Sequence, residues 1–250
     1  MTGIGFGSRF KDSRLGQFAK EPVRAALGRL GLDVVPLRRQ ETDTLGSLLT
    51  DDRLGTLYDV GANQGQYAVR ARLLGYRGDI VSFEPGAEAF RLLNRRAAVD
   101  PRWRTHHMAL GRAPGQQQLQ VSQNSVSSSL LQVNTTHIAA APSSQVRGVE
   151  SVQVARLDDV TSPSDGPCWL KVDTQGYEME VLAGADETLA RARVLQLELS
   201  LTELYDGQAA FLDVLLFVKA RGFQVFDLLP GFRAESGQLL QCDVIAVRQG

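Results

Sequence analysis

The chain has 250 residues, of which 43% are hydrophobic and 22% charged, and its formal net charge is −1 at pH 7. These values are typical of a globular protein of about one domain, and they give no bulk attraction to nucleic acid or to an anionic membrane. No apolar run approaches the ~18 residues of a transmembrane segment, and charged residues such as Arg9 and Lys11 interrupt any signal-peptide core. We therefore expect a cytoplasmic protein with no transmembrane segment and no nucleic-acid partner.

Residues 1–55 are expected to form an N-terminal helical extension ahead of a main domain over residues 56–250. Apolar side chains recur at helical spacing within residues 15–31, and Pro22 suits the first turn of that helix. A second, shorter helix is expected over residues 42–50. The sequence assigns no role to this basic extension.

From residue 56 onward, strand-like and helix-like patterns alternate. Strands are expected over residues 56–60, 79–85, 103–110, 168–173, 194–200, 223–229 and 242–248, and helices over residues 66–75, 86–98, 177–192 and 209–222. Strands separated by helices predict an α/β fold with an open, mostly parallel sheet. Because only a short, turn-rich segment links the last two strands, we expect the last strand to be antiparallel.

Residues 116–156 interrupt this alternation. Polar stretches of period 2 over residues 116–122 and 151–157 bracket a segment rich in Ser, Asn and Thr. This pattern predicts a β-hairpin-like insertion with a long loop rather than a linker between domains. We expect this insertion, together with the N-terminal extension, to build the pocket for the substrate.

The stretch "YDVGANQGQY", residues 58–67, lies between the first strand and the first helix of the main domain. Ligands of open α/β sheets bind at such carboxyl ends of strands. Gly61 lets the chain leave the strand tightly, Gly65 begins the helix, and Asn63 tolerates the positive φ expected between them. Asp59 precedes this loop, and a carboxylate there disfavours a pyrophosphate and favours a cationic ligand. S-adenosylmethionine carries a sulfonium and an ammonium group and has no phosphate.

Glu84 ends the second strand, 23 residues after Gly61. An acidic residue about 20 residues beyond such a loop can accept both ribose hydroxyls of a bound nucleoside. An NAD-dependent oxidoreductase is the alternative enzyme class. The absence of a G-x-G-x-x-G motif and the presence of Asp59 argue against it. A non-catalytic binding module that kept the same fold is a further alternative.

Four motifs occur in the order "DVGANQGQYA", "SFEPGAEAFRLL", "MALGRAPG" and "LKVDTQGYEMEVLAGA". Together they resemble the FkbM family of S-adenosylmethionine-dependent methyltransferases, over residues 56–248. The resemblance implies a class I methyltransferase (Rossmann-like) fold and O-methylation of sugars, polyketides or similar natural products. It also implies donor contacts at Asp59, Gly61, Asn63, Gly65 and Glu84, and at the backbone near Ala109 and Leu110. Gln175 departs from the family pattern, in which Glu is common at this position.

Three carboxylates at neighbouring strand and helix ends are candidates for the chemistry. Methyl transfer to a hydroxyl requires a group that removes the proton of the acceptor. In one interpretation Asp173, which ends the fourth strand, is the general base. In the other, Asp173 binds Mg²⁺ together with Glu178 or Glu198, and the metal lowers the pKa of the hydroxyl. A purely structural role, as a helix cap or an ion-pair partner, is the alternative for Glu178 and Glu198.

Histidines are weaker candidates. His106 and His107 point to opposite sides of the third strand, and His107 is assigned a catalytic role if it reaches the cofactor edge. His137, in the insertion, is a less favoured base or substrate contact. The expected acceptor is a small molecule, most simply a sugar in a glycoside, glycolipid or polysaccharide precursor. The sequence reveals neither its identity nor whether the protein is a homo-oligomer.

Overall fold

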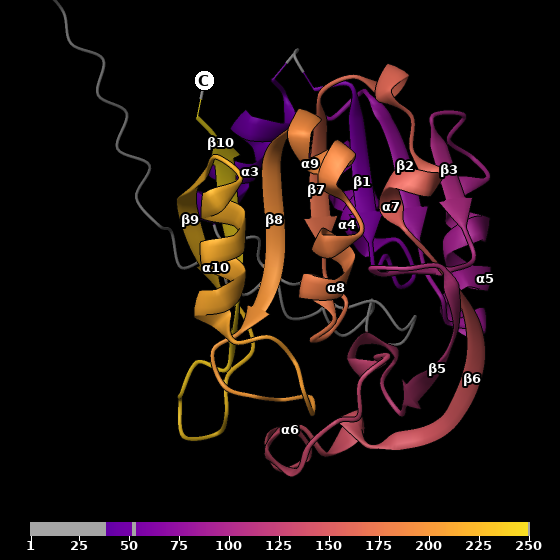
Figure 1. Cartoon of the computed structure of the whole chain (residues 1–250), viewed down its shortest axis with the longest axis vertical. Helices are drawn as coiled ribbons and strands as arrows, with labels where there is room; N and C mark the ends of the chain where they lie inside the picture. Colours follow the sequence, from indigo (N-terminus) through magenta and orange to yellow (C-terminus); the bar gives the residue numbers. More distant parts are fainter. Residues whose placement is uncertain (1–38, 52–53, 250) are drawn as a thin grey trace, which may run out of the picture. The chain divides into compact units, whose positions relative to one another are not determined.

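The computed structural model describes residues 39–51 and 54–249 (Figure 1). The chain divides into two compact units, Met1–Thr42 and Asp43–Gly250, and the second unit contains the sheets and the candidate site. The helix expected over residues 15–31 lies outside the described residues. The expected helix over residues 42–50 corresponds to α3 (Arg39–Leu49), whose Leu45 and Leu49 are buried in the core of the second unit.

The core of the second unit is a seven-stranded sheet in the order β3-β2-β1-β7-β8-β10-β9. Its strands are β1 (Thr56–Val60), β2 (Asp79–Phe83), β3 (Trp103–His106), β7 (Cys168–Val172), β8 (Ala192–Ser200), β9 (Phe223–Pro230) and β10 (Gln241–Arg248). From β3 to β8 neighbouring strands are parallel, whereas β10 is antiparallel to both β8 and β9. This topology confirms the predicted mostly parallel sheet with an antiparallel last strand.

Helices cover both faces of the sheet (Figure 1). After α3, the helices packed against the sheet are α4 (Gln66–Leu73), α5 (Ala87–Ala97), α8 (Glu178–Ala183), α9 (Asp186–Arg191) and α10 (Phe211–Ala220). One buried cluster packs α8, α9 and α10 against the sheet, and the other packs α3, α4 and α5 against the opposite face. The single helix expected over residues 177–192 is broken into α8 and α9. The break lies at Gly184, where an added Cβ would lie 2.1 Å from the Gly111 carbonyl oxygen.

A second, three-stranded sheet carries the insertion. It contains β4 (Ala109–Leu110), β5 (Gly115–Ser122) and β6 (Val146–Ala155) in the order β4-β6-β5. β5 and β6 are antiparallel, as predicted, while β4 runs parallel to β6. The strand expected over residues 103–110 is therefore split, because the chain leaves the main sheet after β3 and joins the second sheet at Ala109.

Short helices complete the described chain. They are η1 (Ser125–Ser127), α6 (Thr135–Ala140), η2 (Pro142–Ser144), α7 (Leu157–Val160) and η3 (Pro163–Asp165). η1, α6 and η2 lie between β5 and β6, within the insertion. Within the described part of the chain, no helix is both long enough and apolar enough to cross a bilayer.

Candidate active site

The loop between β1 and α4 is held in a conformation that needs its two glycines. Gly61 and Gly65 have φ of 73° and 84°, and Asn63 has φ of 48°, so the expected left-handed asparagine is confirmed. A Cβ on Gly61 would lie 1.8 Å from the Asp173 carbonyl oxygen, and one on Gly65 would lie 2.8 Å from the Trp103 ring. The loop is therefore packed tightly against the end of β7 and against β3.

Glu84 fastens this loop to the end of β2. Its Oε2 accepts a hydrogen bond from the backbone N–H of Asn63, and its Oε1 accepts one from the N–H of Gly86, both at 2.8 Å. Burial raises the pKa of Glu84 to about 7, although the two backbone donors act in the opposite direction. Glu84 lines the main cavity of the site, so this carboxyl can meet a ligand while it holds the loop.

Asp59 has a different position from the one expected. Its carboxylate is fully buried beneath the loop, and it does not belong to the residues that line the cavity. It lies 3.2 Å from the ammonium group of Lys171 and accepts a hydrogen bond from Ser82. The charge of Asp59 is thus compensated inside the protein, and the direct attraction to a cationic ligand predicted for it is a misassignment.

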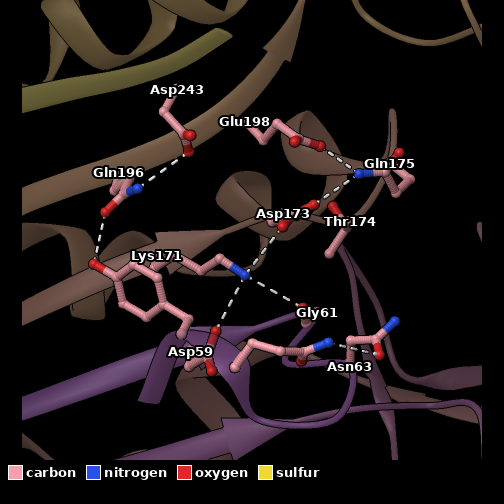
Figure 2. A network of polar contacts seen from close by, with 12 residues as sticks. Asp59, Gly61, Asn63, Lys171, Asp173, Thr174, Gln175, Gln196, Glu198 and Asp243 are labelled. Atoms are coloured by element: carbon pink, nitrogen blue, oxygen red, sulfur yellow. Dashed lines mark hydrogen bonds and ion pairs between the residues drawn. The ribbon is translucent and has the colours of Figure 1, made fainter. Parts of the chain in front are cut away.

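Lys171 is the centre of a buried polar network (Figure 2). Its Nζ lies 3.2 Å from Asp59 Oδ1, from Asp173 Oδ2 and from the carbonyl oxygen of Gly61. Burial disfavours the ammonium form, but the carboxylates of Asp173 and Asp59 outweigh it and raise the pKa of Lys171 above its ordinary value. One cation therefore connects the sheet, the loop and the candidate base.

Asp173 and Glu198 meet through the side chain of Gln175 (Figure 2). The Gln175 amide nitrogen donates to Asp173 Oδ1 at 2.8 Å and also to Glu198 Oε2. Burial alone would raise the pKa of Asp173, but Lys171 and hydrogen bonds from Glu198 and Gln175 hold it below its usual value. Burial and the neighbouring charge of Asp173 raise the pKa of Glu198 well above its usual value. The two shifts run in opposite directions, so the pair favours the charge on Asp173 and the proton on Glu198.

Glu178 does not join this pair. Its Oε1 accepts hydrogen bonds from the N–H and hydroxyl of Thr174 and from the N–H of Gly176, at 2.8, 3.1 and 3.1 Å. The side chain thus closes the turn after β7. The described residues contain no group of three or more His, Cys, Asp or Glu side chains that could hold a metal ion. Of the two ligand pairs predicted for Mg²⁺, Asp173 with Glu178 is not brought together, and Asp173 with Glu198 is, but without a third His, Cys, Asp or Glu among the described residues.

His107 also lies elsewhere than predicted. It is exposed, its Nε2 is 3.0 Å from the Pro85 carbonyl oxygen, and its ring stacks on Phe90 at 4.5 Å. It does not line the cavity, whereas the buried His137 does. Among the described residues, His137 Nδ1 has no hydrogen-bond partner, and burial lowers the pKa of this imidazole. Its position depends on how the insertion packs, which residue spacing alone does not reveal.

The main cavity has a volume of about 380 Å³ and runs from the end of β2 to the carboxyl pair. Gly61, Asn63, Glu84, Ala109 and Leu110 line one end. Further lining comes from side chains that the sequence did not single out together, namely Ser129, His137, Phe232 and Gln241, while Ser125 contacts Asn63 at 3.2 Å. A second pocket of about 300 Å³ shares Asp173 and Glu198 with it. The carboxyl pair thus stands in the wall between two spaces.

Comparison with known proteins identifies a family for the chain. The family described as "Methyltransferase FkbM domain" matches residues 59–225. The 2-O-methyltransferase NoeI of Sinorhizobium fredii (strain NBRC 101917 / NGR234) is 28% identical over 185 residues, which are 70% of this chain and 71% of the relative.

Two crystal structures are also similar. The methyltransferase FkbM from Methylobacillus flagellatus KT has a TM-score of 0.50 and 16% identity, over 77% of this chain and 44% of that one. The matched part is less than half of that protein. An rRNA methylase from Streptococcus thermophilus has a TM-score of 0.48 and 13% identity, over 87% of this chain and 100% of the other. Because the family match covers more than half of the sequence, the chain belongs to the FkbM methyltransferase family.

Proposed function

We propose that the protein transfers a methyl group from S-adenosylmethionine to a hydroxyl oxygen of a small molecule. The observation that carries this proposal is the lining of the main cavity, in which carboxyl groups occur without any Lys or Arg among the described residues. Three carboxyl side chains line it, those of Glu84, Asp173 and Glu198, and none of the described residues around it is Lys or Arg. Such a lining favours a sulfonium ligand and disfavours the pyrophosphate of NAD. It equally disfavours a nucleic-acid backbone as the acceptor.

The end of the cavity near β2 fits the donor. Each carboxylate oxygen of Glu84 already accepts one backbone N–H and retains a further lone pair, so the two oxygens can accept two ribose hydroxyls. Gly61 and Asn63 bring backbone close to the ligand without a bulky side chain. The buried Ala109 and Leu110 offer an apolar surface for the adenine. The volume lies in the range of small-molecule sites, about 300–1,000 Å³.

The chemistry assigned to the chain itself is positioning and proton removal. The bound donor supplies the methyl group and a good leaving group. Asp173, ionised beside Lys171, accepts the proton of the acceptor hydroxyl as the new O–CH₃ bond forms. Glu198 stands beside this base and shares the Gln175 amide with it.

We propose a sugar hydroxyl as the acceptor, in a glycoside, glycolipid or polysaccharide precursor handled in the cytoplasm. Support comes from the relative NoeI, which is a 2-O-methyltransferase. The far end of the cavity also combines the aromatic ring of Phe232 with the amide of Gln241 and the hydroxyl of Ser129. Sugars present both an apolar ring face and hydroxyl groups, and these side chains match that combination.

Calorimetry with S-adenosylmethionine and with NAD tests the donor. Tight binding of NAD without binding of S-adenosylmethionine would refute the proposal. Transfer of a labelled methyl group into sugar-containing extracts, with and without EDTA, then tests the acceptor and the absence of a metal requirement. Donor binding without transfer to any acceptor would instead favour a non-catalytic module.

The base assignment has its own test. Asp173→Asn should lower kcat about 100-fold or more, because a positioned base contributes roughly 10²–10⁴. The exposed Asp206 provides the matched control, Asp206→Asn, which should behave like the wild type. Full activity of Asp173→Asn would show that another group removes the proton.

A further inference from the structure

The amide of Gln175 lies between two carboxyl groups in the wall of the cavity (Figure 2). Both hydrogens of its nitrogen are used, one toward Asp173 and one toward Glu198. Gln241 approaches the same Glu198 oxygen at 3.4 Å from β10. The two carboxyls are therefore held next to each other by a neutral donor that belongs to neither of their strands.

Two hydrogen bonds and an unusual backbone conformation hold Gln175 in place. Its Oε1 lies 2.8 Å from the hydroxyl of the buried Tyr205, while its nitrogen faces the carboxyl pair. Its backbone carbonyl accepts the hydroxyl of Ser129 at 2.7 Å. Its backbone is left-handed, with φ of 57°, a conformation that non-glycine residues rarely adopt without support. The surrounding structure thus imposes the orientation.

Two of these contacts lead into the insertion. Ser129 lies just after η1, and the Tyr205 hydroxyl is also 3.1 Å from the Ser127 carbonyl oxygen. Further backbone bonds connect the same segments, from the Asn134 N–H to Leu204 and from the Asp206 N–H to Gln132. The turn that carries Gln175 is therefore joined to the part of the insertion that lines the cavity.

The neutrality of the amide suits a base and an acid that share one proton. Asp173 and Glu198 both accept from the Gln175 amide, and the direction of the pKa shift of Glu198 favours its protonated form. An amide can donate to both groups without adding charge. A carboxylate at this position would add a third negative group, and an ammonium would drive the proton off Glu198.

We propose that Gln175 is the positioning residue of the carboxyl pair, because its amide fixes Asp173 and Glu198 relative to each other. Its contacts with Ser129 and Tyr205 connect that arrangement to the way the insertion packs against the main sheet. The inference rests on the proposed function, because it assigns the pair to proton removal. Through these contacts, the segment that lines the acceptor end of the cavity also orients the base.

Kinetics test the consequence for catalysis. Gln175→Met keeps the length of the side chain but removes the amide, and it should lower kcat about 100-fold, the effect expected of a base misplaced by about 1 Å, while donor affinity stays within about twofold. Gln175→Glu, which keeps the shape, should be no more active than Gln175→Met. Tyr205→Phe frees the amide to turn and should lower kcat in the same direction by a smaller factor. Gln123→Met, at an exposed glutamine of the insertion, is the matched control and should leave kcat unchanged.

Denaturation tests the coupling between Gln175 and Glu198 without reference to activity. Urea midpoints are compared for Gln175→Met, Glu198→Met and the double variant, and the expected result is that the double variant loses clearly less than the two single losses combined. Additive losses, or a kcat of Gln175→Met or Gln175→Glu within about twofold of the wild type, would overturn the inference. If the wild type transfers no methyl group but the midpoints are non-additive, the proposed function fails and the positioning role stands.

Discussion

Replacing Lys171 with methionine removes the ammonium group that lies 3.2 Å from the buried Asp59 carboxylate. Asp59 is fully buried, and its remaining side-chain contact is Ser82 Oγ at 3.4 Å. Loss of one partner of a buried ion pair costs about 3–5 kcal/mol, because the other charge stays desolvated. We expect Lys171→Met to lower the free energy of unfolding by about this amount at pH 7. The urea midpoint should fall by about 1–2 M.

The loss should depend on pH in a definite direction. Burial already raises the pKa of Asp59, and removal of Lys171 raises it further, so the folded variant binds a proton that the unfolded chain releases. Its stability therefore falls as the pH rises, and the deficit should be smaller at pH 5 than at pH 7. Asp59→Asn combined with Lys171→Met should recover part of the loss. Urea denaturation at both pH values measures this, with Lys219→Met at an exposed lysine as the control. Wild-type stability of Lys171→Met, or no recovery in the double variant, would refute the reasoning.

Three further predictions concern single carboxyl and imidazole groups. Glu84→Gln places an amide donor against a backbone N–H, so it should weaken S-adenosylmethionine binding about 10- to 100-fold, as measured by calorimetry. Because the pKa of Glu84 is about 7, the affinity of the wild type should also fall from pH 8 to pH 6, and the affinity of the variant should not. Glu178→Gln keeps the Oε1 acceptor. Burial raises the pKa of Glu178 from 4.5 in the unfolded chain to about 7 in the folded protein. The wild type therefore loses stability as the pH rises from about 4.5 to about 7. The variant should therefore match the wild type near pH 4.5 and exceed it by up to about 3 kcal/mol at pH 8 in urea denaturation; equal pH profiles would contradict this. His107→Ala should keep kcat within about twofold of the wild type. A larger loss of kcat would show that this exposed side chain takes part in catalysis.

The strands of the main sheet could be predicted because their apolar runs and the intervening helical spacing are local properties of the sequence. The boundaries that failed have tertiary causes. Residues 177–192 have continuous helical spacing, but the close approach of Gly184 to Gly111 divides them. Residues 103–110 have continuous strand character, but the second sheet captures Ala109 and Leu110. Neither contact can be predicted from the local sequence of the helix or strand that it divides.

The site shows the same division. The loop glycines, Asn63 and Glu84 were predicted because their spacing determines their place at the ends of β1 and β2. The sequence revealed the charge of Asp59 but not that its side chain is fully buried. Its cation, Lys171, is a partner 112 positions away, on the neighbouring strand β7. Gln175 was noted only as a departure from a family pattern. Its role as a bridge depends on Glu198 and Tyr205, which arrive from β8 and from the segment after it.

The place of β10 between β8 and β9 has a consequence for how the sheet assembles. Among the described strands, β9 pairs with β10 alone, and β10 follows it in the chain. β9 therefore has no strand to pair with until β10 has been synthesised. Until then, the outer edge of β8 is unpaired and can bind wrong partners. Because β9 and β10 are close in sequence, their hairpin can form early and add to β8 as a unit. We expect this docking to be a late step of folding, and a variant that weakens the pairing of β8 with β10 should aggregate during synthesis more readily than one that weakens β1.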